Sequence, residues 1–419
     1  MNALQKVCAI ASSVALATTL AACGNAGPGG GSGEKVSGDK IALGVITDLS
    51  GVYSELAGKG AVTAVEMAVA DYKKKYGDKA VTDNIEVVSA DHQNKPEIAN
   101  TKAQEMYDRQ GVDAIFDVPT SSAALAVANI AKQKKKLFFD IGAGTTELTG
   151  AQCNAYTYHY GYDTYMLANG TGAALAKAGV KNWYIIYPDY AFGQDMNKSF
   201  VAAINKAGGN VIKSDATPFP NDNFSTFMTR APGLDPKPDV LGTMQAGGDL
   251  VNVVKQYNEF GLKDKGVGLA VGLMFDTDIA SIGVDALSGT QFTTAWFWNL
   301  DDRSRAWADK YKAKTGVRPT FDQAGNYSAA TQYLEAVQRA GSDNADKVNK
   351  ELNGHKVDDF FARNGTIRAE DHNLSHDAYL VQVKEKSEMK EDLDFTKLVQ
   401  TIPADEAFQS AADSGCSMG

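Results

Sequence analysis

Short apolar runs alternate with longer segments of helical period along the first half of the chain. An apolar run at 41–46 precedes residues that recur at steps of three and four: Val62, Val65, Val69, Tyr72 and Tyr76. Strand-like runs at 85–88, 113–118 and 137–141 then alternate with helical segments at 96–108 and 121–133. Strands that alternate with helices predict βαβ units and a mostly parallel sheet.

The same alternation begins again after an aromatic-rich segment at 156–165. We expect strands at 183–187, 211–213, 239–241 and 267–271, and helices at 192–207, 224–230 and 249–260. Two such series predict an α/β protein of two doubly wound lobes. Helices expected at 303–314 and 327–339 then pack on one series or the other, and a further strand is expected at 378–383.

Composition and charge indicate which kinds of molecule this chain could bind. The chain of 419 residues has a hydrophobic fraction of 44% and 40 glycines, which suit a folded α/β protein. Its formal charge is −10. This acidic balance argues against nucleic acid or an anionic membrane surface as a broad partner. A small anionic ligand remains compatible with a locally electropositive site.

The N-terminal segment predicts export. Lys6 precedes a weakly apolar run that closes on the small residues of Leu20-Ala-Ala-Cys23, as in a secretory cleavage site. The run is too short and too often interrupted by hydroxyl residues for a membrane span. A cysteine at the cut resembles the lipobox of bacterial lipoproteins, which predicts removal of residues 1–22, acylation of Cys23 and a flexible tether at 23–39. The alternative is an ordinary signal peptide that ends near a cysteine.

Two unmodified cysteines then remain, Cys153 and Cys416. In an exported protein they predict one disulfide, which would fasten the C-terminal tail, 387–419, back toward the middle of the chain. Two unpaired thiols are the alternative. Their separation lacks the spacing of a zinc ligand pair.

Three loops after predicted strands are rich in glycine and small hydroxyl residues: 48–54, 119–122 and 142–146. Loops at strand ends bind ligands in parallel sheets, and helix N-termini favour anions. Ser121 and Ser122 fit such a site, although they could equally be N-caps. The tyrosines of 156–165 suit a cleft for an apolar or aromatic solute, or interdomain packing.

Signatures of an enzyme are sparse. The chain has neither a complete G-x-S-x-G elbow nor H-E-x-x-H. The segment 170–175 has two of three Rossmann glycines but follows no convincing strand. His372 and His376 would suit a metal only on a helix, whereas a loop is expected there. We therefore predict a protein that is not an enzyme and has no cofactor.

The whole mature chain resembles the leucine/isoleucine/valine-binding family, the type I periplasmic solute-binding proteins of ABC importers. The resemblance rests on modest motifs in a consistent order: 44–51, 89–96, 111–115, 120–126, 147–149, 189–193 and 245–249. It implies two lobes joined by three crossovers that close on a ligand. By the family pattern, the first lobe is 40–158 with 294–376, and the second is 159–293 with 377–386.

The resemblance also implies a ligand site. Ser121, beside Ser122, matches the family's carboxylate-binding serine, and Ala143, Gly144 and Thr145 match a loop that supplies backbone groups and a hydroxyl. Further positions fall on the walls of the cleft: Tyr53, Tyr162 and Phe192.

Asp249 aligns with the acid that holds the ammonium of amino-acid ligands, but it is one carbon shorter and follows Gly247-Gly248. The sequences at 91–96 and 117–122 resemble a subgroup that takes up aromatic carboxylates. Both ligand classes stay open.

These features predict a lipid-anchored, exported and monomeric binding protein that captures a small carboxylate and delivers it to an ABC permease. An alternative is an extracytoplasmic sensor that presents its bound form to a membrane receptor. An exported hydrolase is disfavoured because the chain shows no nucleophile–base arrangement.

Overall fold

The computed structural model describes residues 36–418. The predicted signal peptide and Cys23 lie outside this range. The tether predicted for 23–39 reaches the described residues at 36–39. There Val36 is 4% exposed within the core and the Ser37 N–H donates to the Asp343 carboxylate over 3.0 Å, while residues 37–39 are exposed.

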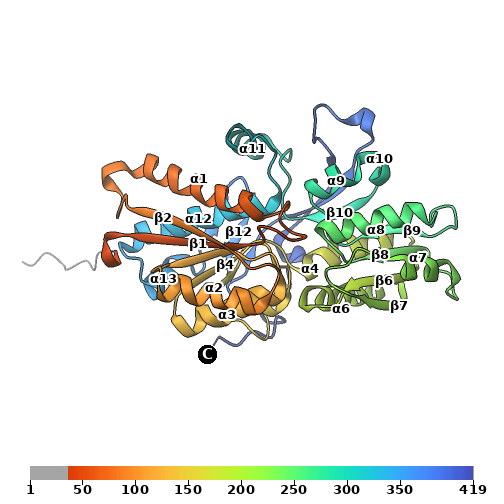
Figure 1. Ribbon diagram of the computed structural model, residues 1–419, viewed down its shortest axis with the longest axis horizontal. Helices are drawn as coiled ribbons and strands as arrows, with labels where there is room; N and C mark the ends of the chain where they lie inside the picture. Colours follow the sequence, from red (N-terminus) through yellow and green to blue (C-terminus); the bar gives the residue numbers. More distant parts are fainter. Residues whose placement is uncertain (1–35, 419) are drawn as a thin grey trace, which may run out of the picture. The chain divides into compact units, whose positions relative to one another are not determined.

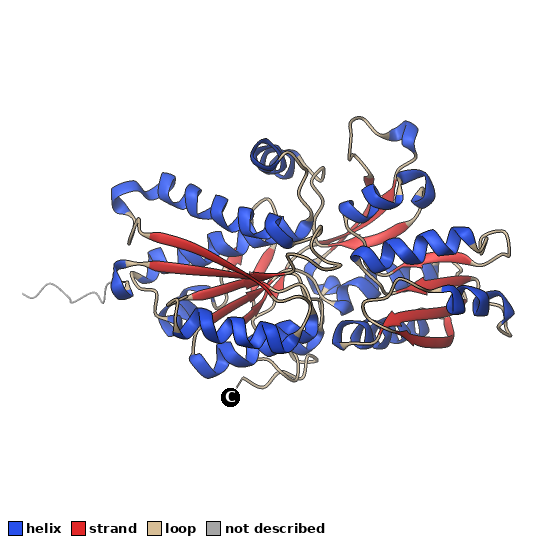
Figure 2. Ribbon diagram, in the orientation of Figure 1, coloured by secondary structure: helices blue, strands red, loops and turns tan. Residues whose placement is uncertain are grey.

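The first lobe is built on a parallel sheet of order β2-β1-β3-β4-β5. Its strands are β1 (Ile41–Thr47), β2 (Ile85–Asp91), β3 (Ala114–Asp117), β4 (Leu137–Asp140) and β5 (Thr157–His159). The connecting helices are α1 (Gly58–Tyr76), α2 (Pro96–Asp108) and α3 (Ser121–Lys134). Helices cover both faces of this sheet (Figure 2). Strand β1 is therefore buried throughout, with Leu43 and Val45 in one core cluster and Ala42 and Ile46 in another.

The second lobe is built on a parallel sheet of order β7-β6-β8-β9. Its strands are β6 (Asn182–Pro188), β7 (Asn210–Thr217), β8 (Val240–Thr243) and β9 (Gly268–Val271). Its helices are α4 (Thr164–Leu167), α5 (Ala173–Lys177), α6 (Ala191–Lys206), α7 (Ser225–Arg230), α8 (Gly247–Glu259), α9 (Asp276–Ile282) and α10 (Val284–Leu287). A π-helix, Ala168–Gly172, joins α4 to α5, so the glycines at 170 and 172 are helical and form no phosphate loop.

Two antiparallel sheets complete the lobes. The strands β10 (Gln291–Thr294), β14 (Ala378–Val383) and β15 (Thr396–Ile402) form one, and β11 (Lys356–Val357), β12 (Gly365–Ile367) and β13 (Leu374–Ser375) form the other. The remaining helices are α11 (Asp302–Thr315), α12 (Phe321–Ala340), α13 (Ala345–Leu352) and α14 (Ala404–Ala407). Since β15 pairs with β14, part of the predicted C-terminal tail is a strand of the second lobe rather than a returning tail.

The chain passes between the lobes after β5, after β10 and after β13, and it returns once more to the first lobe after β15 (Figure 1). After the second passage, α12 packs along α1 of the first lobe. Thr320 begins α12 with a capping box shared with Gln323, and Gly341 ends it at φ +62°. This arrangement places the carboxyl ends of both main sheets beside the three passages. No helix in the described part of the chain is long and apolar enough to cross a membrane.

Candidate ligand-binding site

A small cavity lies where the carboxyl ends of the two main sheets meet, which is where open parallel sheets bind ligands. The segments that follow β1, β3, β4 and β5 line it from one side, and those that follow β6, β8 and β9 line it from the other. All of the lining residues are uncharged: Tyr53, Leu56, Pro119, Gly142, Tyr162, Tyr190, Phe192, Ala246, Leu273 and Phe275.

Aromatic rings fill most of this region. Phe219 stacks on Tyr190 with ring centroids 4.3 Å apart, and Phe275 stacks on Phe321 at 4.5 Å. The enclosed space is about 10 Å³, close to the minimum for one water molecule. A ligand the size of an amino acid or an aromatic acid therefore requires the rings to separate.

Tyr53 is held in place by the loop after β1. The buried carboxylate of Asp48 accepts hydrogen bonds from the N–H groups of Gly51 and Tyr53, at 2.6 and 2.9 Å, and from the Asn94 amide at 2.6 Å. The Tyr53 hydroxyl then meets the Tyr190 hydroxyl of the other lobe at 2.7 Å. The predicted role of Tyr53 as a wall residue fits this geometry, and Asp48 acts as the support of the loop.

Ser121 begins α3 and is fully buried, and its hydroxyl has no hydrogen-bond partner among the described residues. Thr120, rather than Ser121 or Ser122, is the N-cap residue, and the Thr120 hydroxyl bonds the Asn94 side chain. Ser122 is half-buried. Ser121 thus keeps an unused polar group at the N-terminus of a 14-residue helix, where the dipole favours an anion.

The loop after β4 is largely occupied by the protein's own groups. The Ala143 carbonyl meets the His159 Nε2 at 2.8 Å, the Gly144 carbonyl accepts from the Thr164 N–H at 2.8 Å, and the Thr145 hydroxyl accepts from the Glu147 N–H at 3.3 Å. Gly144 lies against the wall: a Cβ there would be 2.8 Å from the Tyr162 ring and 3.0 Å from the Phe192 ring.

Asp249 is the third residue of α8 and is 2% exposed. Its carboxylate accepts from the Asn221 N–H at 3.0 Å, so it fastens the segment before α7. Asp249 does not cap its own helix, because the N-cap residue is Ala246 and no side chain caps that end. Burial raises the pKa of Asp249 to about 7.

The structure thus brings Tyr53, Tyr162 and Phe192 together on the cavity wall, with Gly144 behind two of the rings. The lining does not include the other predicted binding residues: Ser121, Ser122, Ala143, Thr145 and Asp249. Ser121 follows the lining residue Pro119 by two positions, and Ala143 follows the lining residue Gly142 directly.

A buried acidic cluster that was not predicted from the sequence lies behind the cavity. Asn326 of α12 donates to Asp117 at the end of β3 over 3.2 Å and to Asp322 over 3.1 Å. Burial raises the pKa of Asp117 to about 6, and burial with the charge of Asp117 raises the pKa of Asp322. A Cβ on the lining residue Gly142 would be 3.0 Å from the Asp322 carboxyl. No local signal predicts this cluster, because Asp117 lies more than 200 residues before Asp322 and Asn326 in the sequence.

The histidines serve structural contacts. Burial lowers the pKa of His159 to about 4, which leaves its ring neutral against the Ala143 carbonyl. His372 stacks on Tyr158 at 4.2 Å, and His376 bonds the Gly161 carbonyl at 3.1 Å. Within residues 36–418, no three histidine, cysteine or acidic side chains are grouped as a metal site.

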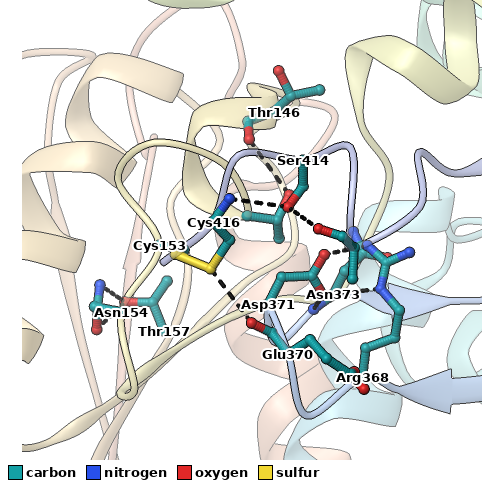
Figure 3. The surroundings of a disulfide bond; sticks show 12 residues. Thr146, Cys153, Asn154, Thr157, Arg368, Glu370, Asp371, Asn373, Ser414 and Cys416 are labelled. Carbon is teal, nitrogen blue, oxygen red and sulfur yellow. Dashed lines mark hydrogen bonds and ion pairs between the residues drawn. A yellow bond between two sulfur atoms is a disulfide. The ribbon is translucent and has the colours of Figure 1, made fainter. Parts of the chain in front are cut away.

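Cys153 and Cys416, the pair expected from the sequence, are joined by a disulfide with Cα atoms 5.6 Å apart (Figure 3). Cys153 belongs to the loop before β5, and Cys416 follows α14. Arg368 bonds the Asp371 carboxylate and the Gln409 carbonyl beside this bond. The chain after β15 is therefore fastened to the first lobe.

A family model for the periplasmic binding protein matches residues 40–388. A solved structure described as a periplasmic binding protein from Burkholderia mallei is 43% identical, with a TM-score of 0.86 over 91% of this chain and 99% of that one. A branched-chain amino acid ABC transporter periplasmic ligand-binding protein from Burkholderia xenovorans is 38% identical, with a TM-score of 0.79 over 90% and 99%.

More distant proteins share the fold. A Leu/Ile/Val-binding protein homolog from Brucella melitensis is 25% identical over 75% of this chain and 84% of its own length. A solute-binding protein from Rhodopseudomonas palustris, solved with 3,4-dihydroxybenzoic acid, is 24% identical, with a TM-score of 0.76 over 87% and 98%. With two α/β lobes, a cavity between them and a family match over most of its length, this chain belongs to the periplasmic binding protein family.

Proposed function

We propose that this chain is the solute-binding component of an ABC importer and that it encloses a small carboxylate with an aromatic body. The observation that carries this proposal is the cavity between the lobes, whose lining is uncharged and rich in aromatic rings. Aromatic side chains provide large apolar contact areas for a planar ligand. Separation of the rings around Tyr190 and Phe275 would admit another ring between them.

The ligand carboxylate binds at the N-terminus of α3 in this proposal. Ser121 supports it, because its buried hydroxyl has no partner among the described residues and hydrogen bonds to an anion are strong. The free N–H groups of the first turn and the helix dipole add to the attraction. Pro119 and Gly142 connect this point to the lined cavity.

The position of Asp249 outside the cavity lining favours an aromatic acid over an amino acid as the ligand. An α-amino acid needs an acceptor for its ammonium group, and Asp249 is absent from the lining and already accepts from Asn221. The Rhodopseudomonas palustris neighbour solved with 3,4-dihydroxybenzoic acid supports an aromatic ligand. The Burkholderia xenovorans neighbour supports a branched-chain amino acid as the second candidate.

A thermal-shift screen tests the proposal. Benzoate, 4-hydroxybenzoate and 3,4-dihydroxybenzoate are compared with leucine, isoleucine and valine, each at several concentrations. A ligand at about 100 times its Kd stabilises the folded state by about 2.7 kcal/mol, so the aromatic acids should raise the melting temperature in a concentration-dependent way. If only the amino acids raise the melting temperature, the ligand is a branched-chain amino acid rather than an aromatic acid. If neither set of compounds raises it, the proposal of a carboxylate site is contradicted.

Delivery to a permease and anchoring through Cys23 complete the proposal. Cys23 and the preceding Leu20-Ala-Ala support lipidation outside the cytoplasmic membrane. Loss of labelled-ligand uptake after deletion of the gene would support import through this binding protein. Normal uptake with loss of a ligand-dependent transcriptional response would support the sensor instead.

A further inference from the structure

A second and larger cavity lies beside the C-terminal half of α6, apart from the one between the lobes. Its volume is about 590 Å³, which is within the range of small-molecule sites. Its lining comes from α4, the π-helix, α5 and α6, and from β14, β15 and α14. Phe192 lines the first cavity at the start of α6, whereas the lining of the second begins on this helix at Ala203, about 16 Å further along. The two cavities are therefore distinct.

Charged side chains of both signs line this second cavity. Lys177 and Lys206 are the last residues of α5 and α6, and Asp405 and Glu406 lie in the first turn of α14. All of them are exposed, and in the described part of the chain none of them forms an ion pair or a side-chain hydrogen bond. The lysines and the acids belong to different elements, and the open volume that these elements enclose leaves the opposite charges unpaired.

Neutral polar groups at the same cavity are also unused. Tyr165, Asn169 and Gln400 line it, and no other residue of the described chain forms a hydrogen bond with their side chains. Asn169 belongs to the π-helix, a rare form that often occurs at functional sites. A hydroxyl and two amide groups are thus available to a bound molecule.

Small and apolar residues form the rest of the lining. The helices contribute small residues, which leave the space open: Gly170, Ala173, Ala174, Ala203 and Ala207. The strands contribute Leu380 and Ile402, which are 5% and 8% exposed. Contact with an apolar chain would remove this surface from water, which is favourable.

We propose that this cavity is a second binding site and that its ligand is a zwitterion with an apolar chain between its charges. Lys177 and Lys206 bind the ligand carboxylate, and Asp405 and Glu406 bind the ammonium group. Each charged side chain then gains a partner of opposite sign, which the fold itself does not supply. The inference goes beyond the proposed function, because the two cavities share no lining residue.

Calorimetric titration with ω-amino acids tests the ligand class. The probes are 4-aminobutanoate, 6-aminohexanoate and 8-aminooctanoate, which differ only in the length of the apolar chain. At low ionic strength, where charges are least screened, at least one of them should bind. Hexanoate and hexylamine, which carry one charge each, should bind about tenfold more weakly than the best zwitterion. Equal affinities for the singly charged compounds, or no binding by any zwitterion, would overturn the proposal.

Substitutions that remove one charge test the place of binding. Lys206→Gln and Glu406→Gln should each weaken binding of the best zwitterion about fivefold, since each removes one charge-assisted contact. Lys255→Gln and Glu259→Gln on α8 are the matched controls, because both residues are exposed and neither lines the cavity. All four changes are at exposed positions, and circular dichroism checks that each variant is folded. Equal affinities in the four variants would overturn the second site.

Titration with 4-hydroxybenzoate separates this site from the proposed function. Its affinity should be the same in the wild type, Lys206→Gln and Glu406→Gln, and saturation with it should leave zwitterion binding unchanged. Competition between the two compounds would place the zwitterion between the lobes and overturn the second site. If no aromatic acid binds the wild type, the proposed function fails, while the zwitterion titrations still judge the second site.

Discussion

Ser121 is a residue whose hydrogen-bonding capacity the folded chain leaves unused. Its hydroxyl is buried without a partner among the described residues. Ser121→Ala should therefore leave the melting temperature unchanged or slightly raised, because it removes an unsatisfied polar group. Binding of the carboxylate found in the screen should weaken by about tenfold, the equivalent of about 1.4 kcal/mol, since a hydrogen bond to a charged group is lost.

Calorimetric titration measures this effect, and Ser122→Ala is the adjacent control. Ser122 is half-buried and is absent from the cavity lining. Its substitution should change the affinity by less than the Ser121 variant does. Equal losses in both variants, or no loss in either, would place the anion elsewhere.

Asp249 carries a pH dependence of stability. Burial raises its pKa in the folded protein to about 7, above that of the unfolded chain. A raised pKa gives stability that is full below the unfolded pKa of about 3.9 and is lost as pH rises through about 7. Asp249→Asn keeps an acceptor for the Asn221 N–H and removes the titration.

The variant should therefore gain free energy of unfolding relative to the wild type as pH rises from 4 to 8. The gain is at most about 4 kcal/mol, from about 1.4 kcal/mol for each pH unit of the shift. Urea unfolding at pH 5 and pH 8 measures it. A difference between the two proteins that does not change with pH would contradict a raised pKa.

The wall residues of the candidate site were expected from the family resemblance rather than from local pattern. Tyr53, Tyr162 and Phe192 follow strands or begin a helix, and all three line the cavity. Phe219 joins the ring cluster from an irregular loop, and nothing in its local sequence marks it. The Asp117–Asp322–Asn326 cluster depends on α12 packing against β3, a contact between distant parts of the chain.

At the scale of elements, periodic segments were predicted well. The helix expected at 96–108 agrees with α2, where Pro96 occupies the first turn, and the eight parallel strands expected in the two lobes are all present. The strands β11 and β13 have two residues each, too few to show a period. The strand β15 was not predicted, because four consecutive residues in its middle are exposed and leave no alternation of apolar and polar positions. Its pairing with β14 joins distant parts of the chain.

The disulfide restrains the segment after β15, which is also held by the bond from Arg368 to the Gln409 carbonyl and by the buried Phe408. It closes a loop of 263 residues in sequence separation, which limits the unfolded chain far more than the folded one. The double variant Cys153→Ser/Cys416→Ser should lose about 2–4 kcal/mol of unfolding free energy. Urea unfolding of the wild type with and without a reductant gives the matched comparison. Identical midpoints for the oxidised wild type and the variant would contradict a stabilising bond.

At the scale of the whole molecule, three passages of the chain and a disulfide-fastened C-terminal segment connect the lobes. The lining of the candidate site therefore comes from residues of both lobes, and no single lobe contains it. The Val52 carbonyl meets the Gly248 N–H of α8 and the Tyr53 ring stacks on Phe219, so contacts beside the cavity also join the lobes. Affinity is then a property of the whole molecule as well as of the lining residues.

If Cys23 is lipidated as proposed, attachment of the acidic body to a membrane should depend on the lipid. Loss of Lys6 with the signal peptide takes the formal charge from −10 to −11, and an anionic membrane surface attracts clusters of Lys and Arg rather than an acidic protein. Cys23→Ala should therefore move the processed protein from the membrane fraction to the soluble fraction of the cell envelope, as followed by immunoblotting. Cys416→Ser, which leaves Cys23 in place, should stay with the membrane. Retention of the processed Cys23→Ala protein at the membrane would contradict anchoring through this cysteine.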